Sequence, residues 1–254
     1  MHGASFPERS HGSGQMLSVV LPVHNEEGNI GRLVREIVEV FETTIKRPFE
    51  IIIVDDASTD RSVEAAGNAE HEIAESGSMA VLKIIRRRNR QGQSASLMRG
   101  IEAAAGSLIV TMDADLQHDP ADIPRLLEIA AGCDMVCGIR KSRSDGTIRG
   151  FCSKVANVFR NIVTYDNTAD SGCTFRVMHK SCVPVIRSFQ GRLYGCEFFF
   201  HPAILRRQGF RVSQCLITHR ERGAGKSRYR LMKGRLVTGI FACFQARKFL
   251  DMRK

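Results

Sequence analysis

Short apolar runs alternate with amphipathic stretches along the first half of the chain. The amphipathic stretches repeat their apolar side chains every three or four residues, which is typical of helices that pack on one face. The apolar runs are nearly continuous, as in strands buried on both faces. Strands are predicted at residues 17–23, 49–54, 81–85 and 107–112, and helices at 30–41, over about fifteen residues after Asp60, and at 94–105. This alternation predicts an α/β fold with a mostly parallel sheet flanked by helices, and Asn29 is the expected N-cap of the first helix.

The second half of the chain has a less regular pattern. We expect helices at 123–131, 151–162 and 196–208, and strands at 134–138, 175–178 and 210–218. A last helix, basic and amphipathic, is expected at 231–250. No internal repeat or linker is evident, so one compact domain is expected over residues 16–230. A disordered lead-in at 1–15 precedes it, and the basic helix within 231–254 follows it.

Two carboxylates, Asp113 and Asp115, stand directly after the apolar run that ends at Met112. In open α/β sheets, ligands bind outside the carboxyl ends of the strands. Carboxylate oxygens at that position suit hard divalent cations such as Mg²⁺ or Mn²⁺, which are often shared with substrate phosphates. An Asp-x-Asp pair also occurs in ordinary solvated turns, so the pair alone leaves both interpretations open.

Acidic pairs follow two further predicted strands. Glu26 and Glu27 follow the first strand, and Asp55 and Asp56 follow the second. The loops after parallel strands lie along one edge of a sheet, so the three acidic loops are expected to converge. Converging carboxylates need a cation or hydrogen-bond donors, and a metal-bound nucleotide supplies both. The G-x-G-x-x-G and G-x-x-x-x-G-K-[ST] phosphate loops are absent from the sequence, which argues against a nucleotide-dependent dehydrogenase or an ATPase.

The positive charge of the chain is concentrated at its C-terminal end. Residues 201–254 contain fourteen basic and two acidic residues, a net charge of +12, whereas the first 200 residues carry −2. Such a block favours an anionic partner, namely phosphate groups, an acidic membrane surface or nucleic acid. No apolar run in the sequence reaches the roughly 18 residues of a membrane span. The eight cysteines form no C-x-x-C pair, so buried thiols in a reducing compartment are favoured over disulfides or a zinc site.

Six ordered motifs between residues 17 and 230 carry a family resemblance. They are LPVHNE at 21–26, IVDDASTD at 53–60, NRQGQ at 89–93, MDADLQ at 112–117, DSGCTFR at 170–176 and HRERGAGKSRY at 219–229. In these motifs the chain resembles the GT-A glycosyltransferases of family 2, and among them the dolichyl- and undecaprenyl-phosphate sugar transferases. The resemblance implies a Rossmann-like GT-A fold in a single compact domain. The Q-x-x-R-W motif of processive members is absent, which argues against a polymerising synthase.

The resemblance also implies an activity. The expected enzyme is an inverting, metal-dependent glycosyltransferase for cell-envelope or lipid-linked glycan synthesis. It would move one sugar from a UDP- or GDP-linked donor to a polyprenyl phosphate, with Mg²⁺ or Mn²⁺ as cofactor. Three alternatives remain: a glycosyltransferase with a non-lipid acceptor, a nucleotidyltransferase and a nucleic-acid-binding protein. A nucleotidyltransferase would usually show a Gly-rich loop with a basic residue early in the chain, and residues 17–30 contain no Lys or Arg. The chain has no Trp and only three Tyr, and the basic C-terminal segment has no known nucleic-acid motif, so no nucleic-acid partner is expected.

Individual residues receive roles from the same resemblance. Asp113, Asp115 and Gln117 would surround the metal, and Asp115 and Arg222 would be catalytic. The nucleotide-sugar would be bound by Pro22, Val23, His24, Glu26, Val54, Asp56 (on the base or ribose), Asp113, Ala114, Asp115, Arg140, Arg222 and Arg228, the last two on the pyrophosphate or the acceptor phosphate. His24 stands where Tyr is frequent, which weakens stacking on the base, and Arg228 replaces a frequent Lys, which keeps charge but changes geometry. The isolated His118, His201 and His219 are expected to be structural.

The basic helix near the C-terminus suggests a location. Relatives often carry transmembrane helices after the catalytic domain, and none precedes Lys254. We therefore expect a cytoplasmic protein that binds peripherally to the cytoplasmic face of the membrane, beside a separate membrane subunit. Leu236, Ile240 and Phe244 are spaced i, i+4, i+8, with Val237 and Phe241 beside them and Lys233, Arg235, Arg247 and Lys248 flanking them. This pattern is typical of a helix at an anionic membrane surface, and packing of the same face on the catalytic domain is the alternative.

Overall fold

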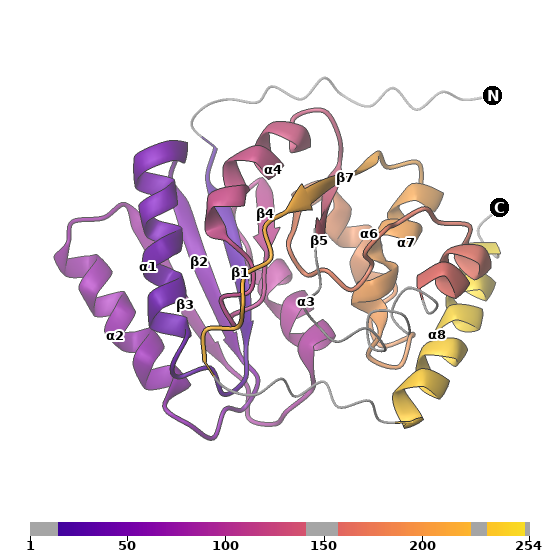
Figure 1. Ribbon diagram of the computed structural model, residues 1–254, viewed down its shortest axis with the longest axis horizontal. Helices are drawn as coiled ribbons and strands as arrows, with labels where there is room; N and C mark the ends of the chain where they lie inside the picture. Colours follow the sequence, from indigo (N-terminus) through magenta and orange to yellow (C-terminus); the bar gives the residue numbers. More distant parts are fainter. Residues whose placement is uncertain (1–14, 141–156, 225–232, 252–254) are drawn as a thin grey trace.

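The computed structural model describes residues 15–140, 157–224 and 233–251, with side chains of the last segment described from Thr238 onwards. Nearly all of the predicted lead-in, the start of the helix predicted at 151–162, and Arg228 therefore lie outside the described residues. The described residues form a seven-stranded sheet with helices on both faces, as Figure 1 shows. The predicted α/β architecture is confirmed.

The sheet order places the first, second and fourth strands side by side. The strands are β1 (Leu17–Val23), β2 (Phe49–Asp55), β3 (Ala80–Arg86), β4 (Leu108–Thr111), β5 (Met135–Arg140), β6 (Arg176–His179) and β7 (Val212–Ile217). Their order is β3-β2-β1-β4-β6-β5-β7. Paired neighbours are parallel except at β6, which runs antiparallel to both β4 and β5. The sheet is therefore mostly parallel, as predicted.

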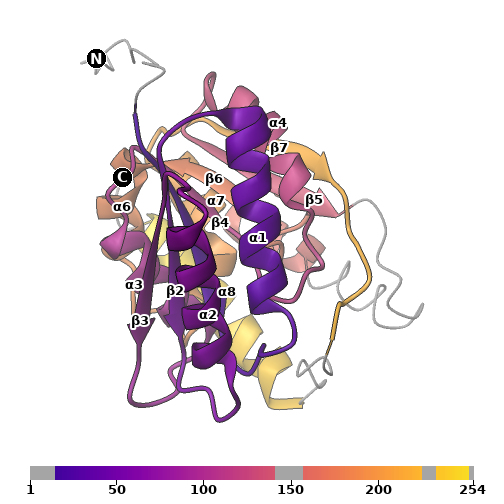
Figure 2. The ribbon, with the colours of Figure 1, turned by 90° about the vertical axis from the view of Figure 1, so that its left-hand side faces the viewer.

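Helices cover both faces of the sheet, which Figures 1 and 2 show from two sides. One face is covered by α1 (Ile30–Val40), α2 (Ser62–Glu75) and α4 (Ile123–Ala130), and the other by α3 (Gln93–Ala103), α6 (Val183–Arg187) and α7 (His201–Arg207). Leu17, Val19 and Leu21 of β1 enter the first core, and Val20 enters the second. Burial on both faces explains why the strands are continuous apolar runs.

Three local features differ from the sequence prediction. The side chain of Asn29 does not cap α1: its Oδ1 accepts no hydrogen bond from the helix, and its Nδ2 donates to Glu26 Oε2 at 2.6 Å. The helix predicted at 196–208 is a 3₁₀ turn, Glu197–Phe200, followed by α7 with Pro202 in its first turn, a position that suits proline. The short helix α6 is missed because five residues are too few to show a helical period.

The last helix, α8 (Lys233–Asp251), packs on the domain through small residues. Its buried residues Ala242, Cys243, Ala246 and Leu250 lie in one cluster with Phe189, Leu193, Phe200 and Ile204. A further helix at residues 157–164 lies beside α8, where Phe159 and Phe244 meet edge-on with ring centroids 6.1 Å apart. Within the described ranges, no helix is long and apolar enough to cross a membrane. No disulfide joins the cysteines that the structure describes.

Gly100 determines how closely α3 approaches the sheet. A Cβ atom there would overlap Val20 Cγ1 and lie 3.1 Å from Val54 Cγ2. We expect Gly100→Ala to lower the free energy of unfolding by about 1–3 kcal/mol, because the helix must shift to admit a methyl group. Gly67 in α2 has open space around such an atom, so Gly67→Ala is the matched control and should raise that free energy by about 0.5–1 kcal/mol. Urea denaturation measures both, and equal losses in the two variants would contradict the packing argument.

Candidate functional site

The acidic loops after β1, β2 and β4 meet at the carboxyl edge of the sheet. These strands are neighbours in the sheet, so the loops that carry Glu26, Asp56 and Asp115 start side by side. Arg222 joins two of them: its Nη1 lies 3.1 Å from Glu26 Oε1 and its Nη2 lies 2.7 Å from Asp115 Oδ2. The predicted convergence of the acidic loops is therefore confirmed.

Hydrogen bonds to the main chain hold the loop that carries Asp113 and Asp115. The N–H of Asp113 donates to Nδ1 of His118 at 3.2 Å, and the N–H of Gln117 donates to Asp115 Oδ1 at 3.1 Å. Leu116 adopts a left-handed conformation, with φ of 65°, that turns the chain. Burial keeps the His118 ring neutral and lowers its pKa to about 4, so Nδ1 is available as an acceptor. His118 is structural, as expected, and it fixes the acidic loop.

Asp113 and Asp115 place two like charges in poorly solvated surroundings. Burial raises the pKa of both carboxyls, and the charge of Asp113 raises the pKa of Asp115 further. A divalent cation fits this pair, because its charge offsets both the repulsion and the loss of hydration. No group of three or more His, Cys, Asp or Glu side chains suited to a metal occurs in the part of the chain that the structure describes. Mg²⁺ is commonly held by one or two carboxylates together with phosphates and water. A third oxygen ligand from Gln117 stays a prediction.

The segment after β7 lies over this acidic loop and brings Arg222 to it. Its contacts are the bridge between His118 and His219, the hydrogen bond from Arg220 N to Gln117 O at 2.8 Å and that from Gly223 N to Asp115 O at 3.3 Å. A Cβ atom on Gly223 would lie 2.6 Å from Leu116 Cδ1 and 2.8 Å from Asn29 Oδ1, so a larger residue there would displace these side chains. Arg222 reaches Asp115 from 107 positions away in the sequence.

Asp56 orders the loop between β3 and α3. Its Oδ1 accepts from Gln91 N at 2.8 Å and its Oδ2 from Gly92 N at 2.7 Å. His24 lies at the same corner, with Nδ1 2.9 Å from the carbonyl oxygen of Asp56. Each carboxylate oxygen of Asp56 keeps a second lone pair that is able to accept from a ligand. Recognition of the base or ribose by Asp56 stays a prediction. The loop leads into α3, where Gln93 Nε2 donates to Asp113 Oδ1 at 2.6 Å.

The other predicted donor-binding residues lie along the same edge or point to it. Pro22 and Val23 end β1, Val54 is the second-last residue of β2, and Ala114 lies between the two aspartates. Arg140 ends β5 and is held by Asp170, which accepts from its Nε at 2.7 Å and from its Nη2 at 2.8 Å. This bidentate pair fixes the direction of the Arg140 guanidinium.

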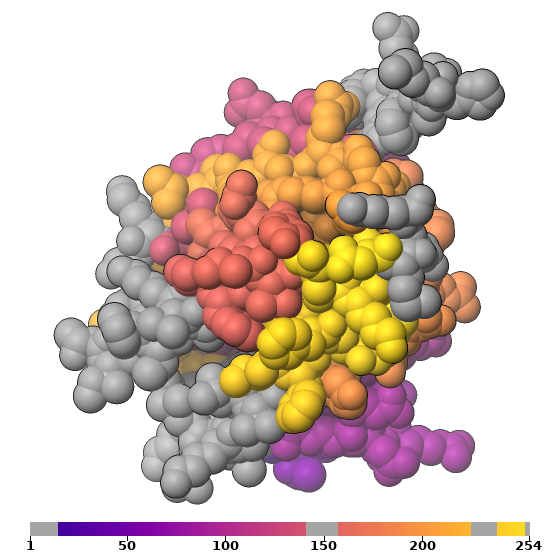
Figure 3. Space-filling view, turned by 90° about the vertical axis from the view of Figure 1, so that its right-hand side faces the viewer, coloured from indigo at the N-terminus to yellow at the C-terminus, as the bar shows by residue number. Residues whose placement is uncertain are grey.

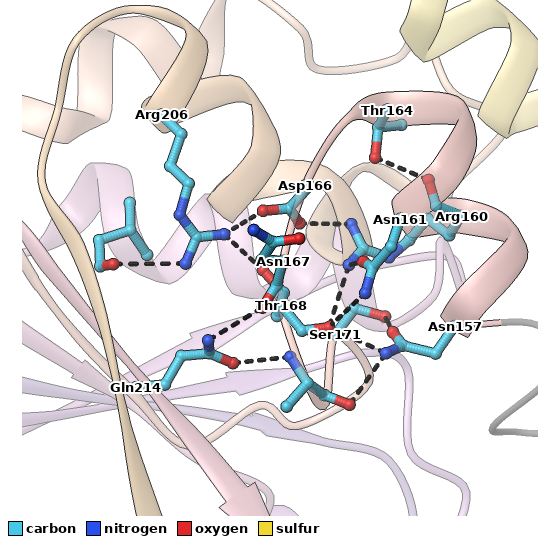
Figure 4. A network of polar contacts seen from close by, with 12 residues as sticks. Asn157, Arg160, Asn161, Thr164, Asp166, Asn167, Thr168, Ser171, Arg206 and Gln214 are labelled. Atoms are coloured by element: carbon cyan, nitrogen blue, oxygen red, sulfur yellow. Dashed lines mark hydrogen bonds and ion pairs between the residues drawn. The ribbon is translucent and has the colours of Figure 1, made fainter.

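A buried polar network supports the segment that carries Asp170 (Figure 4). Asp166 accepts from Arg160 Nη1 at 2.8 Å and also pairs with Arg206 of α7. The carbonyl oxygen of Thr168 accepts from Asn157 Nδ2 at 2.8 Å. The main chain of residues 167–169 also binds Gln214 of β7, whose Oε1 accepts from Ala169 N and whose Nε2 donates to Asn167 O. Helix 157–164, α7 and β7 together fix residues 166–171.

Sequence reasoning gave no role to several residues that shape the site. Gln93 holds Asp113 in place, and Asp170 holds Arg140. Arg176 is fully buried and donates to the carbonyl oxygens of Ser171, Cys173 and Phe198 at 2.7, 2.9 and 2.8 Å. It closes the turn that follows Asp170. Asp170 and Arg176 both belong to the DSGCTFR motif, which was the available signal, but their partners become visible only in the fold.

The raised pKa values of Asp113 and Asp115 predict how the free energy of unfolding of the metal-free protein depends on pH. The folded protein holds protons on Asp113 and Asp115 more tightly than the unfolded chain does. Their contribution to the free energy of unfolding therefore falls as pH rises from about 4 towards neutral. Asp113→Asn removes one of the two charges, so it should be more stable than the wild type at pH 7–8, and the difference should shrink towards pH 4. Thermal melts in EDTA across this range measure the difference.

Asp60 supplies the control for this pH series. Hydrogen bonds from Ser62 lower the pKa of Asp60 against the opposing effect of burial. Its charged form stabilises the fold at neutral pH, so Asp60→Asn should lose stability there. If Asp113→Asn were no more stable than the wild type at pH 7–8, repulsion between the two aspartates would not be significant.

Comparison with known proteins places the chain among sugar-transferring enzymes. The sequence pattern described as Glycosyl transferase family 2 matches residues 18–185. An undecaprenyl-phosphate 4-deoxy-4-formamido-L-arabinose transferase from Pseudomonas paraeruginosa (strain DSM 24068 / PA7) is 36% identical over 219 residues, which cover 86% of this chain and 61% of that protein. The protein of the same name from Edwardsiella ictaluri (strain 93-146) is 33% identical over 220 residues, 86% of this chain and 64% of that protein. The chain spans less than two thirds of the length of these relatives.

Solved structures support the same fold. Glucosyl-3-phosphoglycerate synthase from Mycobacterium tuberculosis, in complex with Mn²⁺, UDP and phosphoglyceric acid, has a TM-score of 0.65 at 18% identity over 91% of this chain and 79% of that chain. Its complex with Mg²⁺ and UDP also gives 0.65 at 18% identity, over 91% of this chain and 80% of that chain. At this identity the likeness establishes the fold alone. Since the family pattern covers well over half of the chain, the protein belongs to glycosyl transferase family 2.

Proposed function

We propose that this chain transfers one sugar from a UDP- or GDP-linked donor to a polyprenyl phosphate, with inversion at the anomeric carbon. The observation that carries the proposal is the Asp113–Asp115 pair beside Arg222 at the carboxyl edge of the sheet. An acidic pair suits a metal-bound pyrophosphate, and an arginine suits its oxygens. The similar proteins are undecaprenyl-phosphate 4-deoxy-4-formamido-L-arabinose transferases, which supports a polyprenyl phosphate as acceptor.

The donor end of the site would hold a divalent cation, Mg²⁺ or Mn²⁺. Asp113 and Asp115 would bind it, with Gln117 as a third oxygen donor. When bound, such an ion stabilises the negative charge that develops on the departing nucleoside diphosphate. The raised pKa of both aspartates, caused first by burial, supports this assignment, because a nearby cation favours their charged form.

Different residues of the protein would bind different parts of the donor. The nucleoside would lie against Pro22, Val23, His24, Glu26, Val54, Asp56 and Ala114. Arg222 would donate to the pyrophosphate, and Arg140, fixed by Asp170, would face the sugar and its phosphates. Arg228 lies outside the described residues, and its phosphate-binding role remains part of the proposal.

The acceptor phosphate requires no strong general base. A phosphate monoester has a second pKa near 6 and is therefore mostly dianionic at neutral pH. One of its oxygens attacks the anomeric carbon from the face opposite the leaving group. The new bond to the acceptor oxygen forms as the bond to the nucleoside diphosphate breaks. The chain contributes arginines that align two anions which otherwise repel each other.

Asp115→Asn tests the metal and donor assignment. The variant should lose turnover by at least a hundredfold, because a neutral amide is a poor ligand for a hard cation and a poor partner for Arg222. Release of UDP or GDP in the presence of polyprenyl phosphate measures it, with and without EDTA. Glu64→Gln, at an exposed carboxylate of α2, is the matched control and should keep wild-type turnover. Normal activity in both Asp115→Asn and EDTA-treated enzyme would refute the assignment. Transfer to a soluble phosphorylated acid but not to polyprenyl phosphate would refute the acceptor.

We further propose that the protein binds the cytoplasmic face of an anionic membrane, where the acceptor phosphate lies. The support is an exposed apolar surface shared by helix 157–164 and α8, which lie side by side in Figure 3. Its residues Val158, Ile162, Tyr165, Ile240, Phe241 and Phe244 are each between 39% and 78% exposed. Arg247 lies 4.0 Å from the Tyr165 ring, which joins the two helices further. The side chains of Leu236 and Val237 lie outside the described residues.

Vesicle flotation tests the membrane proposal. Replacing Ile240, Phe241 and Phe244 by Ser should strongly reduce flotation with anionic vesicles at low salt, because burial of each apolar side chain contributes roughly 1.5–3 kcal/mol. Met79→Ser with Val81→Ser is the matched control, since these exposed residues lie at and beside the edge strand β3. A truncation before α8 is less informative, because it also uncovers the cluster around Phe189 and Leu193. Equal flotation of the triple variant and the wild type would contradict the proposal.

A further inference from the structure

Arg222 occupies one of the two carboxylate oxygens through which Asp115 would bind a cation. Asp115 Oδ1 already accepts from the N–H of Gln117 at 3.1 Å, and Oδ2 pairs with Arg222 Nη2 at 2.7 Å. An ion that binds Asp115 through Oδ2 therefore competes with the guanidinium for the same oxygen. Two positive groups on one carboxylate oxygen repel each other strongly where the surroundings are partly buried.

A second carboxylate is in place to keep Arg222 in the site. Glu26 Oε1 lies 3.1 Å from Arg222 Nη1, and Glu26 Oε2 accepts from Asn29 Nδ2 at 2.6 Å. The N–H of Glu26 donates to Ser62 Oγ at 2.7 Å, which anchors the residue to the start of α2. Asn29 Nδ2 also donates to the carbonyl oxygen of Ala224 at 3.2 Å. The Glu26–Asn29 pair thus binds both the side chain of Arg222 and the main chain two residues after it.

On the basis of the proposed function, we propose that Arg222 is the counter-ion of Asp115 in the metal-free protein. When a divalent cation binds Asp115 in its place, the ion pair with Glu26 keeps Arg222 in the site. Glu26 holds Nη1, so the guanidinium can leave Asp115 without leaving the site. Nη2 then becomes available to donate to an oxygen of the donor's pyrophosphate. Glu26 and Asn29 are positioning residues in this arrangement, because they act through Arg222.

Binding of Mn²⁺ alone, measured by calorimetry without nucleotide, tests the exchange independently of turnover. Arg222→Gln should bind Mn²⁺ about tenfold more tightly than the wild type, because the competing charge has been removed. Arg222→Lys keeps a competing cation and should stay close to the wild type. Arg220→Gln is the matched control: it removes the same charge two residues away, but Arg220 pairs with Glu36 and Asp119. If Arg222→Gln showed no gain over Arg220→Gln, Arg222 would not compete with the cation.

A double-mutant cycle tests the part played by Glu26. Glu26→Gln should weaken Mn²⁺ binding several-fold in the wild-type background, because the displaced Arg222 loses its charged partner. The same change should have no effect in the Arg222→Gln background. An equal loss in both backgrounds would mean that Glu26 acts on the cation directly, which would overturn its positioning role. Thermal melts verify that every variant is folded.

Asp115→Asn separates failure of this inference from failure of the proposed function. If Asp115→Asn abolishes Mn²⁺ binding while Arg222→Gln leaves it unchanged, the metal site stands and the exchange is refuted. If Asp115→Asn binds Mn²⁺ as the wild type does, the metal assignment itself fails. The expected result is loss of binding in Asp115→Asn and gain in Arg222→Gln.

Discussion

Repulsion between carboxylates at one edge of the sheet is the constraint on which the site depends. The order β2-β1-β4 places Glu26, Asp56 and the Asp113–Asp115 pair in neighbouring loops. The fold stabilises each of them differently: Asp56 by two loop amides, Asp113 by Gln93, and Asp115 and Glu26 by a shared Arg222. Arg222 is a charged side chain shared by two of these carboxylates, so a ligand's positive charge at Asp115 would act on both.

The second half of the chain completes this edge. After β4, the antiparallel strand β6 lies between β4 and β5, and β7 adds at the far side of β5. The segment that leaves β7 then returns over the acidic loop through main-chain hydrogen bonds to Gln117 and Asp115. Gly223 lets the segment pass close to Leu116 and Asn29 without displacing their side chains. This path places Arg222 beside Glu26 and Asp115, which belong to the first half of the chain.

Helix 157–164 connects the site with the outer surface. Asn157 and Arg160 on this helix hold residues 166–168, which lead to Asp170 and its partner Arg140. Val158 and Ile162 on the same helix are exposed beside α8. The buried side of the helix therefore supports the segment that holds Arg140, while its outer side belongs to the proposed membrane surface.

The sequence by itself determined the strands, most helices and the acidic edge. Strands buried on both faces are apolar without interruption, and Asp113 and Asp115 follow one of them directly, so local pattern was sufficient. Contacts between residues that are distant in sequence could be identified only from the tertiary structure. Arg222 lies 196 positions from its partner Glu26, and Arg140 lies 30 positions from its partner Asp170. The exposed face of α8 also needed it, because helical spacing shows that Ile240 and Phe244 share a face but not what that face meets. The small residues Ala242 and Ala246 lie in the buried cluster with Cys243 and Leu250, and this packing leaves Ile240, Phe241 and Phe244 on the outer side of α8.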